Sequence, residues 1–223
     1  MINYENFDWG STTKDYQKQM IGEFFSSEKN IYERFFEVEE NDIVVDIGAT
    51  IGEFVFSILD KKPKHCYAVE PLAIFFDTLR KNLEGKPVCF INKAISSEKY
   101  LEIYWDTRKE IIEPLTFNEF INQNRLYKID FLKVDCEGGE YNVFTKNNIE
   151  FLKKVPKIVV EFHLSNKVLK EHFRVFRDTI LKQFPKFEVY SLDNVNIKWD
   201  LYNEHFIQYY REVMFYFDNR IKE

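Results

Sequence analysis

The chain has 223 residues, of which 31 are lysine or arginine and 37 are aspartate or glutamate, so it is long enough for one α/β domain with a full core. The net charge of -6 leaves no basic footprint for nucleic acid or an anionic membrane and favours a neutral or uncharged substrate. No apolar run approaches the roughly 18 residues that span a bilayer, and acidic residues near the start exclude a signal peptide, so we expect an unprocessed cytoplasmic protein without a membrane partner.

Helical and strand patterns alternate along the chain. Residues 14–36 predict a helix because Tyr16, Met20 and Phe24 recur at every fourth position. We interpret residues 1–40 as an N-terminal helical cap on a main domain over residues 41–223, the two forming one globular unit. The apolar runs that predict strands cover residues 43–47, 66–69, 88–91, 131–134, 157–162, 187–190 and 213–217.

The segments between these strands carry helical stripes, listed here in chain order: Ile51, Phe54, Val55, Ile58 and Leu59; Leu72, Phe75, Phe76, Leu79 and Leu83; and Leu169, Phe173, Phe176, Ile180 and Phe184. Shorter helices are expected over residues 116–124 and 141–152, and an extra strand or hairpin over residues 101–106. Continuous apolar strands that alternate with helices indicate a doubly wound, mostly parallel sheet covered on both faces.

A ribose-binding pattern follows the first two predicted strands. Gly48 and Gly52 form a strand-to-helix turn with the spacing D-x-G-x-x-x-G from Asp46, and Glu70 ends the next strand, where a carboxylate can accept hydrogen bonds from ribose hydroxyls. Thr50 stands where a pyrophosphate-binding loop needs glycine, which disfavours a phosphate. S-adenosylmethionine carries no phosphate and has positive sulfonium and ammonium groups, so the carboxylates of Asp46 and Glu70 do not repel it.

Four segments together resemble the FkbM-type family of S-adenosylmethionine-dependent methyltransferases: residues 45–52, 69–71, 92–96 and 132–140, the last with the motif E-G-G-E. The resemblance implies a class I, Rossmann-like methyltransferase fold and methyl transfer to a hydroxyl of a sugar, a glycan or a related metabolite. It implies that the cofactor contacts Asp46, Gly48, Ala49, Gly52, Glu70, Pro71, Ala94, Ile95 and Asp135, with residues 92–95 near the adenine. The sequence departs from the family at Thr50, where asparagine is usual, and at Asn118, where aspartate is usual.

Candidate catalytic groups follow the fourth and fifth predicted strands, which we expect to lie side by side. His163 is our expected general base, because an ordinary histidine is mostly neutral near pH 7 and can take the proton of an alcohol. Asp135 or Glu137 would orient this histidine or bind neighbouring hydroxyls of the acceptor. The alternative is that His163 is inert and that the acids satisfy turn amides. Glu140 is expected to complement the dipole of the next helix.

The sequence leaves the metal requirement open, since four acids and a histidine at the ends of these two strands could also hold Mg²⁺ or Mn²⁺: Asp135, Glu137, Glu140, Glu161 and His163. Cys66, Cys89 and Cys136 have no metal-type spacing and indicate a reducing compartment, and the acids beside Cys136 make it a poor nucleophile. Two other functions are considered: a non-catalytic S-adenosylmethionine-binding module of a polysaccharide-modifying complex, and a nicotinamide-dependent oxidoreductase, against which Thr50 argues. The acceptor and the oligomeric state are not predicted.

Overall fold

The computed structural model describes residues 4–25, 30–105 and 107–220. By its internal contacts the chain divides into two compact units, Met1–Ala94 with Glu98–Pro114, and Ile95–Ser97 with Leu115–Glu223. The expected division into a cap over residues 1–40 and a main domain over residues 41–223 stays a prediction.

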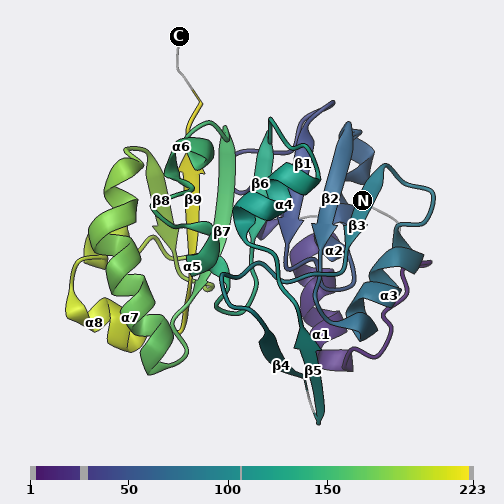
Figure 1. The fold of residues 1–223 in the computed structure, drawn as a ribbon, viewed down its shortest axis with the longest axis horizontal. Helices are drawn as coiled ribbons and strands as arrows, with labels where there is room; N and C mark the ends of the chain where they lie inside the picture. The colour runs from purple at the N-terminus through teal and green to yellow at the C-terminus, as the bar shows by residue number, and fades with distance from the viewer. Residues whose placement is uncertain (1–3, 26–29, 106, 221–223) are drawn as a thin grey trace. The chain divides into compact units, whose positions relative to one another are not determined.

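The first unit is built on three parallel strands in the order β3-β2-β1 (Figure 1). They are β1 (Ile43–Ile47), β2 (His65–Val69) and β3 (Val88–Ile91), and they confirm the first three predicted strands. The connections contain α2 (Glu53–Ile58), the 3-10 helix η3 (Leu59–Lys61) and α3 (Ala73–Asn82). The predicted stripes supply the core: all of their members in this unit are buried except Leu59 and Phe76, which are half-buried.

The N-terminal segment is less regular than the periodicity predicts. It contains α1 (Lys14–Met20), the π-helical turn η1 (Ile21–Phe25) and the 3-10 turn η2 (Ile31–Glu33). The single helix predicted over residues 14–36 is therefore wrong for its second half, with residues 26–29 outside the described residues. The segment belongs to the first unit, and the Tyr16 hydroxyl donates a 2.5 Å hydrogen bond to Glu53 at the start of α2.

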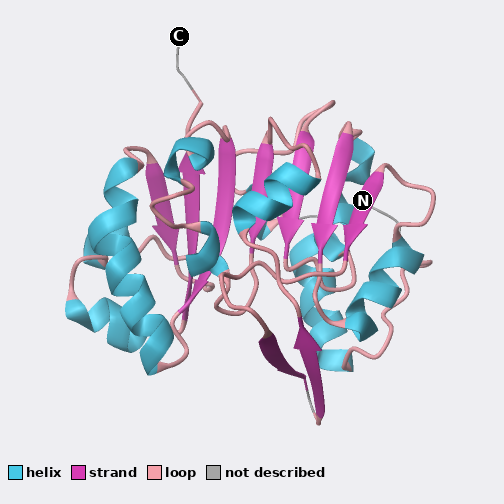
Figure 2. Ribbon diagram, viewed as in Figure 1, coloured by secondary structure: helices cyan, strands magenta, loops and turns pink. Residues whose placement is uncertain are grey.

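The strand or hairpin expected over residues 101–106 is a hairpin, with residue 106 itself outside the described residues. Its strands are β4 (Leu101–Trp105) and β5 (Arg108–Ile112), and Figure 2 shows them as a separate two-stranded ribbon. The hairpin packs against the start of α3, where the rings of Trp105 and Phe75 lie 4.8 Å apart between centroids and Glu110 accepts a hydrogen bond from the Ala73 amide at 3.1 Å.

The second unit contains the other four predicted strands. β6 (Phe131–Val134) and β7 (Lys157–His163) are parallel, whereas β9 (Glu212–Asp218) is antiparallel to β7 and β8 (Phe187–Tyr190) is antiparallel to β9. Its helices are α4 (Phe117–Gln123), α5 (Glu140–Val143), α6 (Ile149–Leu152), α7 (Lys167–Val175) and α8 (Glu204–Tyr209). Shorter turns are η4 (Phe176–Ile180), η5 (Leu181–Gln183) and η6 (Lys198–Asp200).

Local side-chain hydrogen bonds set the helix limits of this unit. The helix predicted over residues 116–124 is confirmed as α4, whose N-terminus is capped reciprocally by Thr116 and Glu119, so Asn118 leaves the cap intact. The helix predicted over residues 141–152 is wrong as one piece. It breaks into α5 and α6 because the Asn148 side chain donates to the Val143 carbonyl at 2.8 Å and takes a partner that a continuous helix would use.

Aromatic rings fill the core of the second unit. Phe162 of β7 lies 4.2 Å from Phe176 and 5.3 Å from Phe215 between ring centroids, which joins the helical segment after α7 to the strands. The predicted helical face is buried at Phe173, Phe176, Ile180 and Phe184. The helix nevertheless widens to a π-helical turn at η4 and tightens to a 3-10 turn at η5. Within the described part of the chain, no helix combines the length and apolar character that a membrane crossing needs.

Candidate functional site

The turn after β1 is held against the end of β2 in a conformation that favours glycine. The amides of Gly48 and Ala49 both donate to the Val69 carbonyl, at 2.9 and 3.0 Å. Gly48, Thr50 and Gly52 have positive φ angles of 84°, 46° and 95°. Because asparagine tolerates this left-handed region far better than a β-branched residue does, the departure from asparagine at Thr50 puts strain into the turn.

Gly52 is required by packing as well as by its backbone angle. A Cβ atom at this position would lie 2.9 Å from Leu79 Cδ1 and 3.0 Å from Leu83 Cδ1. This glycine therefore lets the start of α2 approach Leu79 of α3 and Leu83 at the end of that helix. Its contact with a cofactor, like that of Ala49, stays a prediction.

Glu70 is the central side chain of this turn region. Its Oε2 accepts a hydrogen bond from the Thr50 amide at 3.0 Å and its Oε1 accepts one from the Leu72 amide at 2.8 Å, so the carboxylate joins the turn after β1 to the end of β2. Burial raises the pKa of Glu70 to about 8; the two amide hydrogen bonds oppose the shift, and the charges of Glu53 and Asp46 add to it. Each oxygen keeps acceptor capacity for a further donor such as a hydroxyl.

The main chain beneath Glu70 is fixed by a residue after β3. The Asn92 side-chain amide donates to the carbonyls of Glu70 and Pro71, both at 2.9 Å. The sequence placed Asn92 near the adenine only through the family resemblance, and this supporting contact was not foreseen. An asparagine that directly follows a strand, one strand over from an acid, is the signal that could have suggested it.

Three further predicted cofactor contacts, Asp46, Ala94 and Ile95, are buried. Asp46 lies within β1 opposite Ala68 of β2 and is fully buried. Ala94 is the last residue of the first stretch of the first unit, whereas Ile95 belongs to the second unit and forms a bridge with Leu115. The expected adenine contacts of Ala94 and Ile95 stay predictions.

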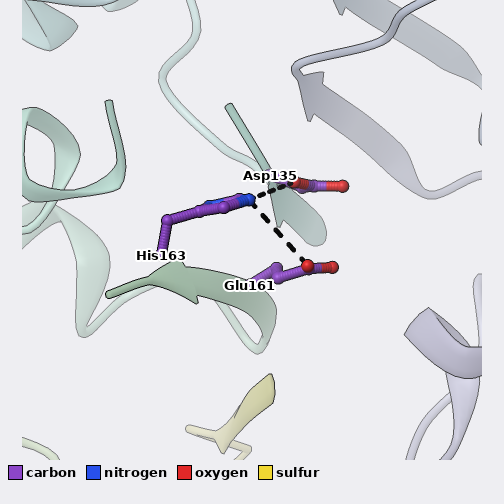
Figure 3. A group of neighbouring side chains, drawn as sticks. All are labelled: Asp135, Glu161 and His163. Carbon is purple, nitrogen blue, oxygen red and sulfur yellow. Dashed lines mark ion pairs between the residues drawn. The ribbon is translucent and has the colours of Figure 1, made fainter. Parts of the chain in front are cut away.

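Acidic side chains gather around one histidine in the second unit. Asp135 directly follows β6, and Glu161 and His163 lie near the end of β7, so the expected adjacency of these two strands is confirmed. His163 Nε2 lies 3.9 Å from Asp135 Oδ1, 3.9 Å from Glu161 Oε1 and 3.5 Å from Glu137 Oε2. Figure 3 shows the imidazole of His163 directed toward the carboxylates of Asp135 and Glu161.

Glu140 orients this histidine, a role that the sequence assigned to Asp135 or Glu137. Its Oε1 lies 3.0 Å from His163 Nδ1 and also accepts hydrogen bonds from the amides of Cys136 and Gly138, at 2.9 and 3.1 Å. Glu140 is the first residue of α5, as the sequence predicts, and it is fully buried. Its carboxylate folds back over the glycine turn and reaches β7, which the helix-dipole argument did not anticipate.

The carboxylates change the expected charge of His163. Burial alone would lower the pKa of His163, but the hydrogen bond to Glu140 and the charges of Glu140, Asp135 and Glu137 raise it to about 10. The premise that His163 is a neutral base near pH 7 is therefore wrong for the protein as it stands. Burial also raises the pKa of Glu161, and Asp135 adds to that shift.

Cys136 lies in the same turn. Desolvation first, then the charges of Glu140 and Asp135, raise the pKa of the Cys136 thiol well above its usual value. The thiolate is the reactive form of cysteine, so the expectation that Cys136 is a poor nucleophile is confirmed. All three cysteines are free thiols in the structure.

The residues of the first unit fit S-adenosylmethionine. The carboxylate of Glu70 has spare acceptor capacity and lies at the end of β2, and the turn after β1, with its positive φ angles, lies against it. This arrangement suits a ribose. A second carboxylate, that of Asp46, lies within the neighbouring strand. Acids in this position suit a positively charged sulfonium better than a pyrophosphate.

Comparisons with known proteins agree with this fit. Alpha N-terminal protein methyltransferase 1 of Schizosaccharomyces pombe is 38% identical over 58 residues, so the match spans only about a quarter of either chain. Two solved structures share the fold at a TM-score of 0.50. One is SMU.1697c of Streptococcus mutans, which is described as a methyltransferase and was solved with S-adenosylhomocysteine. It is 12% identical, and the match covers 93% of this chain and 99% of that chain. A fibrillarin/Nop5p complex is 15% identical, with 93% and 83% covered.

These likenesses show the α/β, class I methyltransferase fold that the sequence predicts, with strands that are mostly parallel. The decisive match is to a family. The model of the methyltransferase FkbM domain matches residues 46–184, more than half of the chain, and includes both the Glu70 region and the cluster around His163. The chain therefore belongs to the FkbM family of S-adenosylmethionine-dependent methyltransferases, and its cofactor is S-adenosylmethionine.

Proposed function

We propose that this protein transfers the methyl group of S-adenosylmethionine to a hydroxyl group of a sugar, a glycan or a small hydroxylated metabolite. The observation that carries the proposal is the carboxylate of Glu70, fixed by the Thr50 and Leu72 amides in a chain of a methyltransferase family. The direction toward oxygen rests on the cluster of acids around His163 and on what is typical of the family.

The first unit holds the cofactor in this proposal. Glu70 accepts hydrogen bonds from the ribose hydroxyls, and Asn92 keeps the main chain of Glu70 and Pro71 in place. Asp46 compensates part of the positive charge. When bound, the cofactor supplies an activated methyl group on a sulfonium, which leaves readily as a neutral thioether.

The second unit serves the acceptor. An alcohol is a poor nucleophile until its proton is removed, so a group that accepts this proton must lie within hydrogen-bond reach of the hydroxyl. Asp135 is half-buried and Glu137 is exposed at 88% of its side-chain surface, so both can meet an acceptor from solvent. Asp135 takes the role of proton acceptor here, because the neighbouring acids hold a proton on His163.

The charge of the site favours an uncharged acceptor. Carboxylates at the ends of β6 and β7 accept hydrogen bonds from the neighbouring hydroxyls of a sugar, whereas a nucleic acid or another polyanion meets repulsion. The net charge of -6 acts in the same direction. We place this reaction in the cytoplasm, on the basis of three free thiols and no disulfide among the described cysteines.

The experiment is a transfer assay with labelled S-adenosylmethionine and a fractionated extract of small hydroxylated metabolites and glycans, followed by identification of the labelled product. We expect the label as a methyl ether on oxygen, with its yield reduced at least tenfold in Asp135→Asn. Glu150→Gln is the control, because Glu150 is an exposed acid of the same unit on α6. Label on nitrogen or carbon would refute the oxygen assignment. Tight binding of S-adenosylhomocysteine without transfer to any fraction would instead support the non-catalytic module.

A further inference from the structure

The cluster in the second unit has the composition of a metal site. Asp135, Glu161 and His163 each present one ligand atom, and these atoms all lie within 4.8 Å of one another. Both carboxylate oxygens lie 3.9 Å from His163 Nε2, too far for a hydrogen bond and close enough to share a common ligand (Figure 3). Two carboxylate oxygens and one imidazole nitrogen are a set of ligand atoms that divalent cations of the first-row transition metals accept.

The orientation of His163 is a second, independent observation. Only 3% of this residue is exposed, and Glu140 Oε1 holds its Nδ1 at 3.0 Å. Because that oxygen also accepts two backbone amides, Nδ1 is the nitrogen that carries hydrogen toward it. Nε2 therefore faces the acids, and a cation bound there would displace the proton of Nε2. Among the described residues Nε2 has carboxylate neighbours at 3.5 to 3.9 Å and no hydrogen-bond partner.

We infer that Asp135, Glu161 and His163 bind one divalent first-row cation, with Mn²⁺ as the suitable probe. A histidine whose second nitrogen is held by a carboxylate is the arrangement that metal sites use to fix the ligating nitrogen and raise its basicity, and Glu140 supplies it here. The imidazole favours Mn²⁺ over Mg²⁺, which prefers oxygen ligands and gives up its water reluctantly.

The distances fit a cation after a small closure of the side chains. Ligand bonds of about 2.1 Å place two ligands of one ion at most about 4.2 Å apart, so the two separations of 3.9 Å already fall in this range. Lys133 Nζ lies 3.9 Å from Asp135 Oδ2, whereas Oδ1 is the oxygen of Asp135 that lies 3.9 Å from His163 Nε2. Glu137 is exposed and can complete the charge balance from the solvent side.

The cation would polarise an acceptor hydroxyl and lower its pKa, which is the difficult part of methyl transfer to an alcohol. Because Asp135 would be occupied as a ligand of the ion, the proton released from the hydroxyl would pass to the exposed Glu137 carboxylate in its place, and from there to water. This role rests on the proposed function, whereas binding of the ion does not, so the ion is measured without cofactor or acceptor.

The test is a titration of the full-length protein with Mn²⁺, in which the electron paramagnetic resonance signal of the free ion reports how much of the ion is bound. We expect one ion bound per chain, with affinity reduced at least tenfold in both Asp135→Asn and Glu161→Gln and unchanged in Glu150→Gln. Circular dichroism checks that each variant is folded. If Glu161→Gln does not fold, the comparison of wild type with Asp135→Asn tests the inference. No saturable binding by the folded wild type, or equal binding by wild type and Asp135→Asn, would overturn the inference. Methyl transfer that continues at full rate in excess chelator would remove the catalytic role of the ion and leave the proposed function standing.

Discussion

Cofactor binding should be linked to the ionisation of Glu70. The carboxylate is buried, and its burial raises the pKa to about 8, so at neutral pH most of the cofactor-free protein carries a protonated Glu70. A ribose diol donates two hydrogen bonds and is best met by the ionised carboxylate, whose oxygens are already aligned by the Thr50 and Leu72 amides. Binding should therefore release a proton and strengthen as the pH rises.

The size of the effect follows from the fraction of ionised Glu70. With a pKa of about 8, this fraction is about 3% at pH 6.5 and about 75% at pH 8.5. If only the ionised protein binds, the apparent dissociation constant varies inversely with that fraction, so the affinity should rise about 25-fold across this range.

Calorimetry with S-adenosylhomocysteine at several pH values, in two buffers of different ionisation enthalpy, measures both the affinity and the released proton. Glu70→Gln should bind weakly and lose this pH dependence, while Glu84→Gln, a change at an exposed acid just after α3, should follow the wild type. The ratio of wild-type to Glu70→Gln affinity cancels the titration of the ligand's own amine. A ratio that stays constant from pH 6.5 to pH 8.5 would refute the reasoning, whatever the absolute affinities.

Two further predictions concern stability, and chemical denaturation monitored by circular dichroism checks both. Gly52→Ala should lower the free energy of unfolding by roughly 2 to 5 kcal/mol, because φ is left-handed at 95° and the new Cβ would crowd Leu79 and Leu83. Gly85→Ala is the control, with a φ of 72° but open space around its Cβ, and it should lower the free energy of unfolding by only about 1 to 2 kcal/mol. Equal losses in the two variants would contradict the crowding argument. Glu140→Ala should cost roughly 3 to 5 kcal/mol because it leaves two half-buried amides and His163 Nδ1 without their acceptor. Glu140→Gln keeps one oxygen and should cost less than half as much. Equal costs would show that the charge of Glu140, which both variants remove, is what stabilises the protein, and not its hydrogen bonds.

The strands could be predicted well because a buried strand is recognised from a short run of apolar residues. Val44 and Val45 of β1 and Val159 and Val160 of β7 are fully buried, and continuous apolar runs of this kind indicate a strand covered on both faces. The antiparallel direction of β9 could not be read in this way, because an apolar run does not record the direction of its neighbours. Direction depends on the connection through α8 and the preceding loops.

The helices were predicted less accurately where polar side chains compete for the backbone. The spacing of Tyr16, Met20 and Phe24 is helical, yet the segment becomes a π-helical turn from Ile21. After α5, the Asn148 side chain takes a main-chain carbonyl and interrupts the helix. This second departure depends on a side-chain hydrogen bond, which periodicity does not contain.

The members of the site were predictable from the strand ends, but their roles were not. Sequence spacing brought Asp135, Glu137 and His163 to one edge of adjacent parallel strands, and the structure places them together. The charge of His163 depends on how many carboxylates surround it, and one of them, Glu140, folds back from the following helix. Such a count of neighbours is a property of the fold, so the ordinary pKa of histidine misled the assignment of a neutral base.

The two acid sites of this chain are built in the same way. In each unit two main-chain amides fix one carboxylate. Glu70 is held by Thr50 from the turn after β1 and by Leu72 from the turn after β2, and Glu140 is held by Cys136 and Gly138, both from the turn after β6. At Glu140 both amides come from the same turn and donate to the same oxygen, so this turn must be tight.

Glycine makes the turn after β6 narrow. Gly138 has a φ of 106° and a Cβ there would lie 2.8 Å from Leu169 Cδ2, while a Cβ at Gly139 would lie 2.9 Å from Cys136 Sγ. The motif E-G-G-E therefore has a physical reason beyond its acids: its glycines allow the turn that aims Glu140 at His163. A chain with the same acids and bulkier residues between them would keep the charge of the site and lose its geometry.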